Sequence, residues 1–431
     1  MALPIAASIF VPQINFIINT IFLSGLGQKE LGLAGITGVY YLIFAVIGFG
    51  LNNGLQALIA RRSGEKRYGE ISALFTQGII ISFAFAFAGI MLTYTLAPAI
   101  LKYSMKDAAN VDMAVDFLKI RIWGLPFLYV YQLRNALLIG INQSKYLLWG
   151  TVAETLFNVF FDYGFIYGKF GLPDLGFNGA AYASIIAEFM GMFIIFLVIK
   201  NKGIIKELGL FVSFKFNKAI SSSIFKMSAP LIMQHAISII SWEFFYLLIE
   251  HYGDRQLAVS NTMRNIFGFF GCTTWAFGAT TSAMVSNIIG QGLQHRVSEL
   301  IWKIIKLSTG FSLVIFLIIN SMPSTILSIY GQGDAFVAEA IPVLRIVTFA
   351  LVIMSFGVVY FNAVTGTGNS AVTLYIEIAA IILYCIFVYT TLRVFNLPIM
   401  YGWMSEWLYW ISLFIPSFIY LKTNRWKGKV I

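Results

Sequence analysis

Long apolar runs alternate with short polar segments along the whole chain. Most runs are roughly 20 to 30 residues long, and an α-helix needs about 20 residues to cross the hydrocarbon core of a bilayer. The runs lie at residues 3–25, 33–59, 72–98, 115–140, 146–168, 176–199, 227–250, 257–287, 300–322, 340–364, 371–392 and 399–421. A β-barrel would show alternating segments of about ten residues. The pattern therefore predicts an all-α polytopic membrane protein with twelve transmembrane helices.

The same pattern occurs twice in the chain. One constant shift along the sequence, the repeat offset, superposes glycines and prolines near helix ends: Pro4 on Pro230, Gly27 on Gly253, Gly64 on Gly290 and Gly140 on Gly366. Each half holds an even number of predicted helices, so both halves enter the membrane in the same direction and the repeat is parallel. We expect six-helix lobes over residues 1–199 and 227–431, joined by a cytoplasmic, lysine-rich linker over residues 200–226. A cavity is expected between the lobes.

Composition and charge agree with a membrane protein. Of the 431 residues, 59% are hydrophobic and 11% are charged, whereas about a quarter of a soluble protein is charged. The net charge of +10 does not indicate a nucleic-acid partner, because most basic residues follow the predicted topology. With the N-terminus inside, sixteen of them lie on inner connections and six on outer ones. The positive-inside rule thus predicts both termini in the cytoplasm, in a multi-pass protein of the cytoplasmic (plasma) membrane.

The fifth apolar run carries a polar stripe. In TVAETLFNVFFDYGF, Glu154, Asn158 and Asp162 are spaced four residues apart, so they share one helix face over about 12 Å. Ionisable groups in hydrocarbon are costly and therefore mark candidate functional sites. The face lines an aqueous cavity that binds Na+ or carries a proton, or it forms a polar ladder between helices. Asn19 in the first run lies at a depth similar to that of Asp162.

Three segments carry a family resemblance. LPIAASIFVPQINFIINTIFLSGLGQKELGLAGI (3–36), GLNNGLQALIARRSGE (50–65) and GLPDLGFNGAAYAS (171–184) resemble multidrug and toxic compound extrusion (MATE) transporters. The resemblance implies a V-shaped pair of six-helix lobes that exports organic, often cationic, compounds in exchange for Na+ or H+. It implies no cofactor beyond that coupling ion. We expect a monomer that takes small organic substrates and has no enzymatic activity.

The resemblance also assigns residues to a cation site in the first lobe. Asn158 and Asp162 match the family motif, and Asn135 in the fourth run corresponds to another polar residue of the same cavity. Many relatives have an acid where this chain has Asn19, so the coupling ion and its stoichiometry stay open. We predict Asp162 as the coupling carboxylate, with Asn158 as a second Na+ ligand and Glu154 as an inner relay.

The second lobe and the substrate cavity offer further candidates. Glu243 in the seventh run is a coupling residue or one half of a structural ion pair with Arg264 in the eighth. Glu188, Glu377 and Glu406 receive no role. Aromatic and methionine side chains accommodate flat organic cations. The predicted substrate contacts on the fourth and tenth runs are Tyr131, Gln132, Met354 and Tyr360.

One alternative function is a lipid-linked saccharide or lipid flippase, which would hold pyrophosphate with basic side chains in the cavity. Its candidate residues are Lys119, Arg121, Arg134, Arg264 and Arg345. An enzyme is not expected, because the three histidines are scattered and no nucleotide-binding GxxxxGK[ST] motif occurs. The missing motif also argues against an ATP-driven pump.

Overall fold

The computed structural model describes residues 1–105, 107–212 and 214–428, apart from the side chains of residues 13, 16 and 104. The first half contains helices α1 (Ala2–Ser24), α2 (Gln28–Gly64), α3 (Tyr68–Ser104), α4 (Ala108–Arg121), α5 (Leu125–Gly140), α6 (Leu147–Tyr167), α7 (Gly176–Asn201) and α8 (Ile204–Leu208). The second contains α9 (Lys218–Glu250), α10 (Asp254–Gly290), α11 (Val297–Ser321), α12 (Pro323–Ser328), α13 (Asp334–Gly366), α14 (Ser370–Tyr389), α15 (Ile399–Trp403) and α16 (Ser405–Lys422).

Helical segments match all twelve predicted transmembrane runs in the described part of the chain, and eight of the described helices are long and apolar enough to cross a membrane. The fourth consists of α4 and α5, which a short 3-10 turn joins, and the twelfth consists of α15 and α16. Helices α8 and α12 are short connectors. Several helices extend past the apolar runs into polar flanks, as α2 does by beginning at Gln28, because backbone hydrogen bonding continues where the hydrocarbon ends. The predicted all-α polytopic fold is confirmed.

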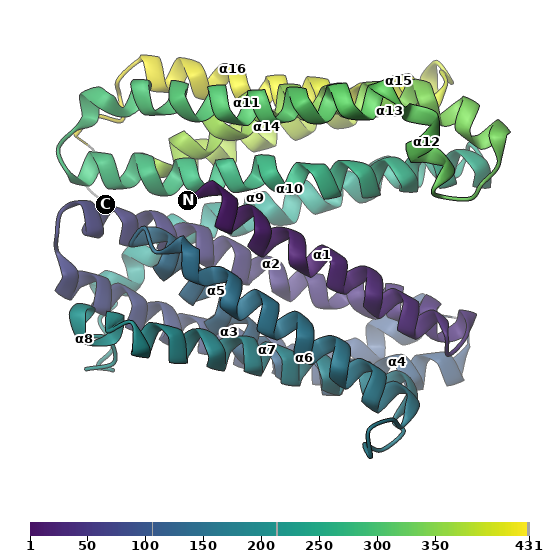
Figure 1. Cartoon of the computed structure of the whole chain (residues 1–431), viewed down its shortest axis with the longest axis horizontal. Coiled ribbons are helices and arrows are strands. Elements are labelled where there is room, and N and C mark those ends of the chain that lie inside the picture. Colours follow the sequence, from purple (N-terminus) through teal and green to yellow (C-terminus); the bar gives the residue numbers. More distant parts are fainter. Residues whose placement is uncertain (106, 213, 429–431) are drawn as a thin grey trace. The chain divides into compact units, whose positions relative to one another are not determined.

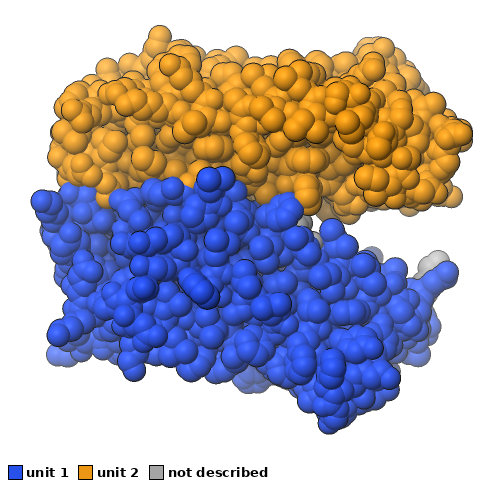
Figure 2. Space-filling model, viewed as in Figure 1, with its two compact units in different colours: residues 1, 3–232 blue, residues 2, 233–431 orange. Residues whose placement is uncertain are grey.

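The chain divides into two compact units (Figure 2). Unit 1 contains residues 1 and 3–232, and unit 2 contains residues 2 and 233–431. In unit 1, α2, α3 and α5 pack against one another and α6 pairs with α7 (Figure 1). In unit 2, α13 is the central helix and packs against α10, α11 and α16. Each unit therefore has its own apolar core.

The two units repeat the same helix geometry. The repeat offset that relates Pro4 to Pro230 also relates both ends of α2 to both ends of α10, and it places α13 on the stretch from α4 to α5. A Cβ added to Gly140 would lie 2.7 Å from Cγ2 of Ile59, and one added to Gly366 would lie 2.6 Å from the Ser282 carbonyl oxygen and 3.0 Å from Cβ of Val285. Ile59 and Val285 are themselves equivalent positions of the repeat. The predicted parallel repeat is thus confirmed, and the same close helix crossing occurs in both units.

We expect Gly366→Ala to lower the stability of unit 2. The new methyl group would press on a backbone oxygen of α10, so α10 and α13 must separate, at a cost of about 1–3 kcal/mol. Gly310→Ala on α11 is the matched control, because a Cβ there meets nothing within 4 Å and alanine favours the helix. Thermal unfolding in detergent measures both variants. Equal midpoints would contradict the tight crossing.

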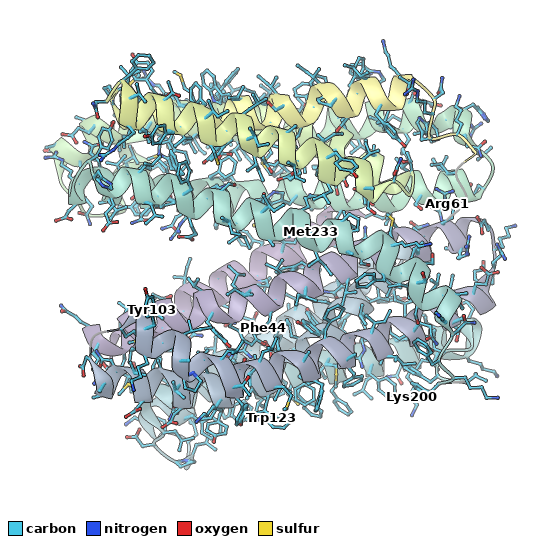
Figure 3. The ribbon with its side chains drawn as sticks, turned by 180° about the vertical axis from the view of Figure 1, so that it is seen from behind. Phe44, Arg61, Tyr103, Trp123, Lys200 and Met233 are labelled. Carbon is cyan, nitrogen blue, oxygen red and sulfur yellow. The ribbon has the colours of Figure 1, made fainter. Side chains whose placement is uncertain are left out.

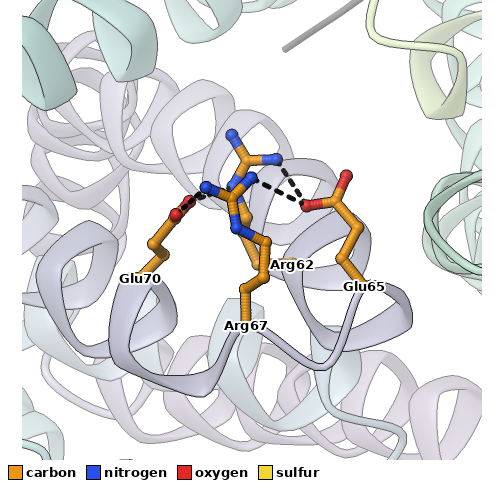
Figure 4. A network of polar contacts seen from close by, with 4 residues as sticks. All are labelled: Arg62, Glu65, Arg67 and Glu70. Carbon is orange, nitrogen blue, oxygen red and sulfur yellow. Dashed lines mark hydrogen bonds and ion pairs between the residues drawn. The ribbon is translucent and has the colours of Figure 1, made fainter.

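Basic residues gather at one end of unit 1. Figure 3 shows Arg61 at the end of α2 and Lys200 at the end of α7 on the same side, opposite Tyr103 at the end of α3. Close by, the turn between α2 and α3 holds an ion-pair network (Figure 4). Arg62 forms ion pairs with Glu65 at 2.8 Å and with Glu70 at 2.7 Å, and Arg67 forms ion pairs with the same two acids. Exposed pairs of this kind contribute little stability each, but together they tie the two helix ends.

The end of the predicted linker is held against unit 1. Gln77 on α3 is buried; its Nε2 donates to the Lys215 carbonyl at 2.8 Å. Its Oε1 accepts from the backbone N–H of Asn217 and from the Ser221 hydroxyl, both at 3.0 Å. Helix α9 begins at Lys218, before the predicted linker ends.

Candidate functional site

The polar face of α6 points into unit 1. Asp162 is 0% exposed and Asn158 is 2% exposed, whereas Leu156 and Phe160 on the opposite face are exposed. Both carboxyl oxygens of Asp162 are buried and have no hydrogen-bond partner in the described structure. A carboxyl group that is buried and unsatisfied is costly to retain unless it has a task. Asp162 is therefore the strongest site candidate in the chain.

Helix α1 contacts α6 close to Asp162. The Tyr167 hydroxyl at the end of α6 donates to the Phe22 carbonyl at 2.6 Å, and the rings of Phe22 and Tyr163 lie 5.9 Å apart. Asn19 precedes Phe22 by one turn, and Asp162 directly precedes Tyr163. Both helices are thus in contact beside these two residues. The Oδ1 atoms of Asn15 and Asn19 are buried without a hydrogen-bond partner, so amide oxygens are available at this depth.

A second cluster of polar side chains lies nearer the start of α6. The hydroxyls of Tyr131 on α5 and Thr151 on α6 are 2.8 Å apart. Glu154 and Asn135 lie close to the Tyr131 hydroxyl, and the Oδ1 of Asn135 has no hydrogen-bond partner in the described structure. The fifth-run stripe therefore has two parts: Glu154 lies beside the hydrogen-bonded hydroxyls of Tyr131 and Thr151, whereas both oxygens of Asp162 lack partners.

A buried ion pair in unit 1 was missed by the sequence analysis. The Arg121 guanidinium at the end of α4 donates to both carboxylate oxygens of Glu188 on α7, at 2.5 and 3.0 Å. It also donates to the Tyr41 hydroxyl at 3.0 Å and lies 3.8 Å from the centre of that ring. Gly124 leaves room, since a Cβ there would clash with both charged groups. The sequence feature that could have predicted this ion pair is the presence of the oppositely charged Arg121 and Glu188 in two predicted spans.

The comparison with known sequences assigns the chain to a family. The MatE family model matches residues 4–164 and again residues 230–390, so the two matches begin at the repeat-related Pro4 and Pro230. The chain belongs to the MatE family. The probable multidrug resistance protein NorM of Synechocystis sp. is 28% identical over 198 residues, which are 46% of this chain and 42% of that protein. NorM of Neisseria meningitidis serogroup B is 22% identical over 353 residues, 80% of this chain and 75% of the relative.

Solved structures share the fold. A crystal structure of MATE in complex with MaL6 superposes with a TM-score of 0.90 at 17% identity, covering 98% of this chain and 94% of that one. A MOP superfamily transporter from Pyrococcus furiosus gives 0.86 at 18% identity over the same shares. At this identity the likeness establishes the twelve-helix MatE architecture and leaves the site to be argued from the residues.

The second MatE repeat lacks the polar site. The repeat offset takes Asn19, Asn158 and Asp162 to Phe245, Tyr384 and Val388. The rings of Phe245 and Tyr384 are 6.3 Å apart, and Phe245 also lies 5.2 Å from the Trp403 ring. Val388 is fully buried. Unit 2 therefore has aromatic and aliphatic side chains at the positions that carry the polar residues in unit 1.

The predicted substrate residues are buried within their own units. Tyr131 is hydrogen-bonded as described above, and Gln132 lies against Gly48 on α2 with its Oε1 unpartnered. Met354 is fully buried in the core of unit 2. The Tyr360 ring packs 5.2 Å from Phe414 and 5.4 Å from Phe418. Their role in substrate binding stays a prediction.

Glu243 and Arg264 do not pair with each other in this structure. Both side chains are exposed, and the Arg264 guanidinium lies over the Tyr246 ring at 4.9 Å. Among the described residues, the ion pairs of unit 2 are Arg255 with Glu339 and Lys303 with Glu299. The coupling role of Glu243 stays a prediction.

Proposed function

We propose that this MatE protein is a secondary active exporter of small organic, often cationic, compounds, driven by exchange for Na+ or H+. The observation that carries the proposal is Asp162, a fully buried carboxyl with two unpartnered oxygens. The names of the relatives, which are multidrug resistance proteins, support export of organic compounds. The proposed exporter is a monomer and not an enzyme.

Asp162 is proposed to change partners during transport. A buried carboxylate requires a cation or a proton, and carboxylate and amide oxygens are the ligands that hard cations prefer. Asn19, Asn135 and Asn158 would supply amide oxygens, and Glu154 would act as an inner relay. Tyr131, Gln132, Met354 and Tyr360 are proposed to contact the substrate; because all four are buried in this structure, they would have to become accessible during transport.

The proposed topology follows the charges. Lobes over residues 1–199 and 227–431 would alternate between inward and outward access in the cytoplasmic membrane, with residues 200–226 and both termini in the cytoplasm. The flippase alternative receives less support, because Arg121, one of its cationic candidates, is already paired with Glu188.

Efflux from proteoliposomes tests the function. Purified protein is reconstituted with a fluorescent organic cation inside, and Na+ and pH gradients are imposed separately. We expect at least one gradient to drive net export against the substrate gradient, because coupling supplies the free energy. Collapse of that gradient with an ionophore should stop export, and ATP should have no effect. Export that is indifferent to both gradients, or ATP hydrolysis by the purified chain, would refute the proposal.

A further inference from the structure

Unit 2 buries a carboxyl group of its own. Glu377 on α14 is 1% exposed. Its Oε1 accepts from the Tyr409 hydroxyl on α16 at 2.6 Å and from the Ser238 hydroxyl on α9 at 2.9 Å. Its Oε2 is buried and has no hydrogen-bond partner in the described structure. Glu377 is therefore the point at which side chains of α9, α14 and α16 meet.

No cation balances Glu377 among the described residues. The ion pairs of unit 2 involve other acids, and the rings around Tyr409 are those of Tyr384 at 6.1 Å and Trp410 at 5.0 Å. The helices that meet at Glu377 carry further titratable residues: Lys218, Lys226, His235, Glu243, Tyr246 and Glu250 on α9, Tyr375, Tyr384, Cys385 and Tyr389 on α14, and Glu406, Tyr420 and Lys422 on α16. Glu406 accepts from the Trp410 indole N–H at 3.2 Å.

The hydrogen bonds indicate which oxygen carries the proton. A carboxylate without a countercharge is strongly disfavoured in an aromatic interior, so the group is neutral. Both hydroxyls donate to Oε1 and lie 3.3 Å from each other, so Oε1 is occupied and Oε2 is the oxygen left to carry a proton. Glutamic acid in this state satisfies both hydroxyl donors with one oxygen.

The surroundings of Glu377 favour a proton over a metal cation. In unit 1, the Oδ1 of Asn19, one turn before the contact of α1 with α6 beside Asp162, is unpartnered and suits a dehydrated cation. Around Glu377, the oxygen groups in contact are hydroxyls that already donate to Oε1. No further hydrogen-bonding group contacts Glu377 among the described residues, so a Na+ ion would find few oxygen ligands besides the carboxylate and the two hydroxyls.

We propose that Glu377 is a second coupling site in this protein, specific for protons, which binds one proton on Oε2 and releases it to solution as the carboxylate during transport. Coupling to transport rests on the proposed exporter function, whereas protonation of Glu377 does not. Ser238 and Tyr409 are positioning residues, because they act on the proton through Oε1.

Infrared spectroscopy of reconstituted protein tests the protonation without any transport. Glu377→Gln should remove one protonated-carboxyl band from the wild-type spectrum, and Ser238→Ala should shift that band, because one donor to Oε1 is lost. Glutamine keeps the acceptor for both hydroxyls, so the variant should fold. Glu406→Gln is the matched control and should leave the band in place. A band unchanged in Glu377→Gln, or lost in Glu406→Gln instead, overturns the proposal.

Proton counting tests the exchange. In proteoliposomes that transport substrate, Glu377→Gln should move fewer protons per substrate and retain the transport that depends on Asp162. An unchanged proton count overturns the coupling role. If wild-type protein moves no substrate under any gradient, the exporter function fails, and the infrared band still decides the protonation of Glu377.

Discussion

Asp162→Asn should abolish cation-coupled efflux while the protein remains folded and inserted. The substitution removes the only group on the buried face of α6 at this depth that can exchange a charge, and it preserves size and shape. Because both oxygens of Asp162 lack partners, the fold loses no hydrogen bond, and removing a buried ionisable group relieves a desolvation cost. We therefore expect no loss of thermal stability. Gradient-driven efflux and the unfolding midpoint, measured on one preparation, check both parts.

Asp112→Asn is the matched control for this result. Asp112 lies on α4 and is exposed, so the same chemical change there should leave efflux at the wild-type level. Efflux by Asp162→Asn that equals wild type would remove Asp162 from the mechanism. A strong fall in the unfolding midpoint would instead favour the polar-ladder interpretation of α6.

Arg121→Met should destabilise unit 1 by about 3–5 kcal/mol, because it leaves Glu188 buried without its partner. Glu188 is 6% exposed and receives two hydrogen bonds from Arg121. Its remaining contact in this cluster is the Tyr41 hydroxyl at 3.4 Å, which does not replace a positive charge. Denaturant or thermal unfolding in detergent measures the loss.

The double variant Arg121→Met/Glu188→Leu separates the ion pair from simple packing. Replacing both partners removes the unpaired charge, so most of the lost stability should return, and the double-mutant cycle should give a coupling free energy well above that of an exposed pair. A double variant as unstable as the sum of the single variants would show that the pair contributes through packing alone.

The sequence predicted the helices and their repeat because the bilayer imposes a strong local rule. An apolar stretch must be long enough to span the hydrocarbon and must satisfy its own backbone, so all twelve spans could be assigned without knowing their neighbours. The repeat offset followed from Gly64 and Gly290, which end α2 and α10, and from Gly140 and Gly366, where a close helix crossing requires glycine in both units. The face shared by Asn158 and Asp162 followed from helical spacing alone.

The partners of the polar groups were decided by the tertiary structure. Arg121 and Glu188 lie 67 residues apart, and Ser238 and Glu377 lie 139 residues apart, so no local pattern connects them. The sequence placed Glu154, Asp162, Glu188 and Glu377 inside spans but did not show which side chains they contact. Folding pairs Glu188 with an arginine, places two hydroxyls on Glu377, and leaves both oxygens of Asp162 without partners. Which acid is free to exchange depends on these contacts, because in a low-dielectric interior the neighbours of a carboxyl determine its charge.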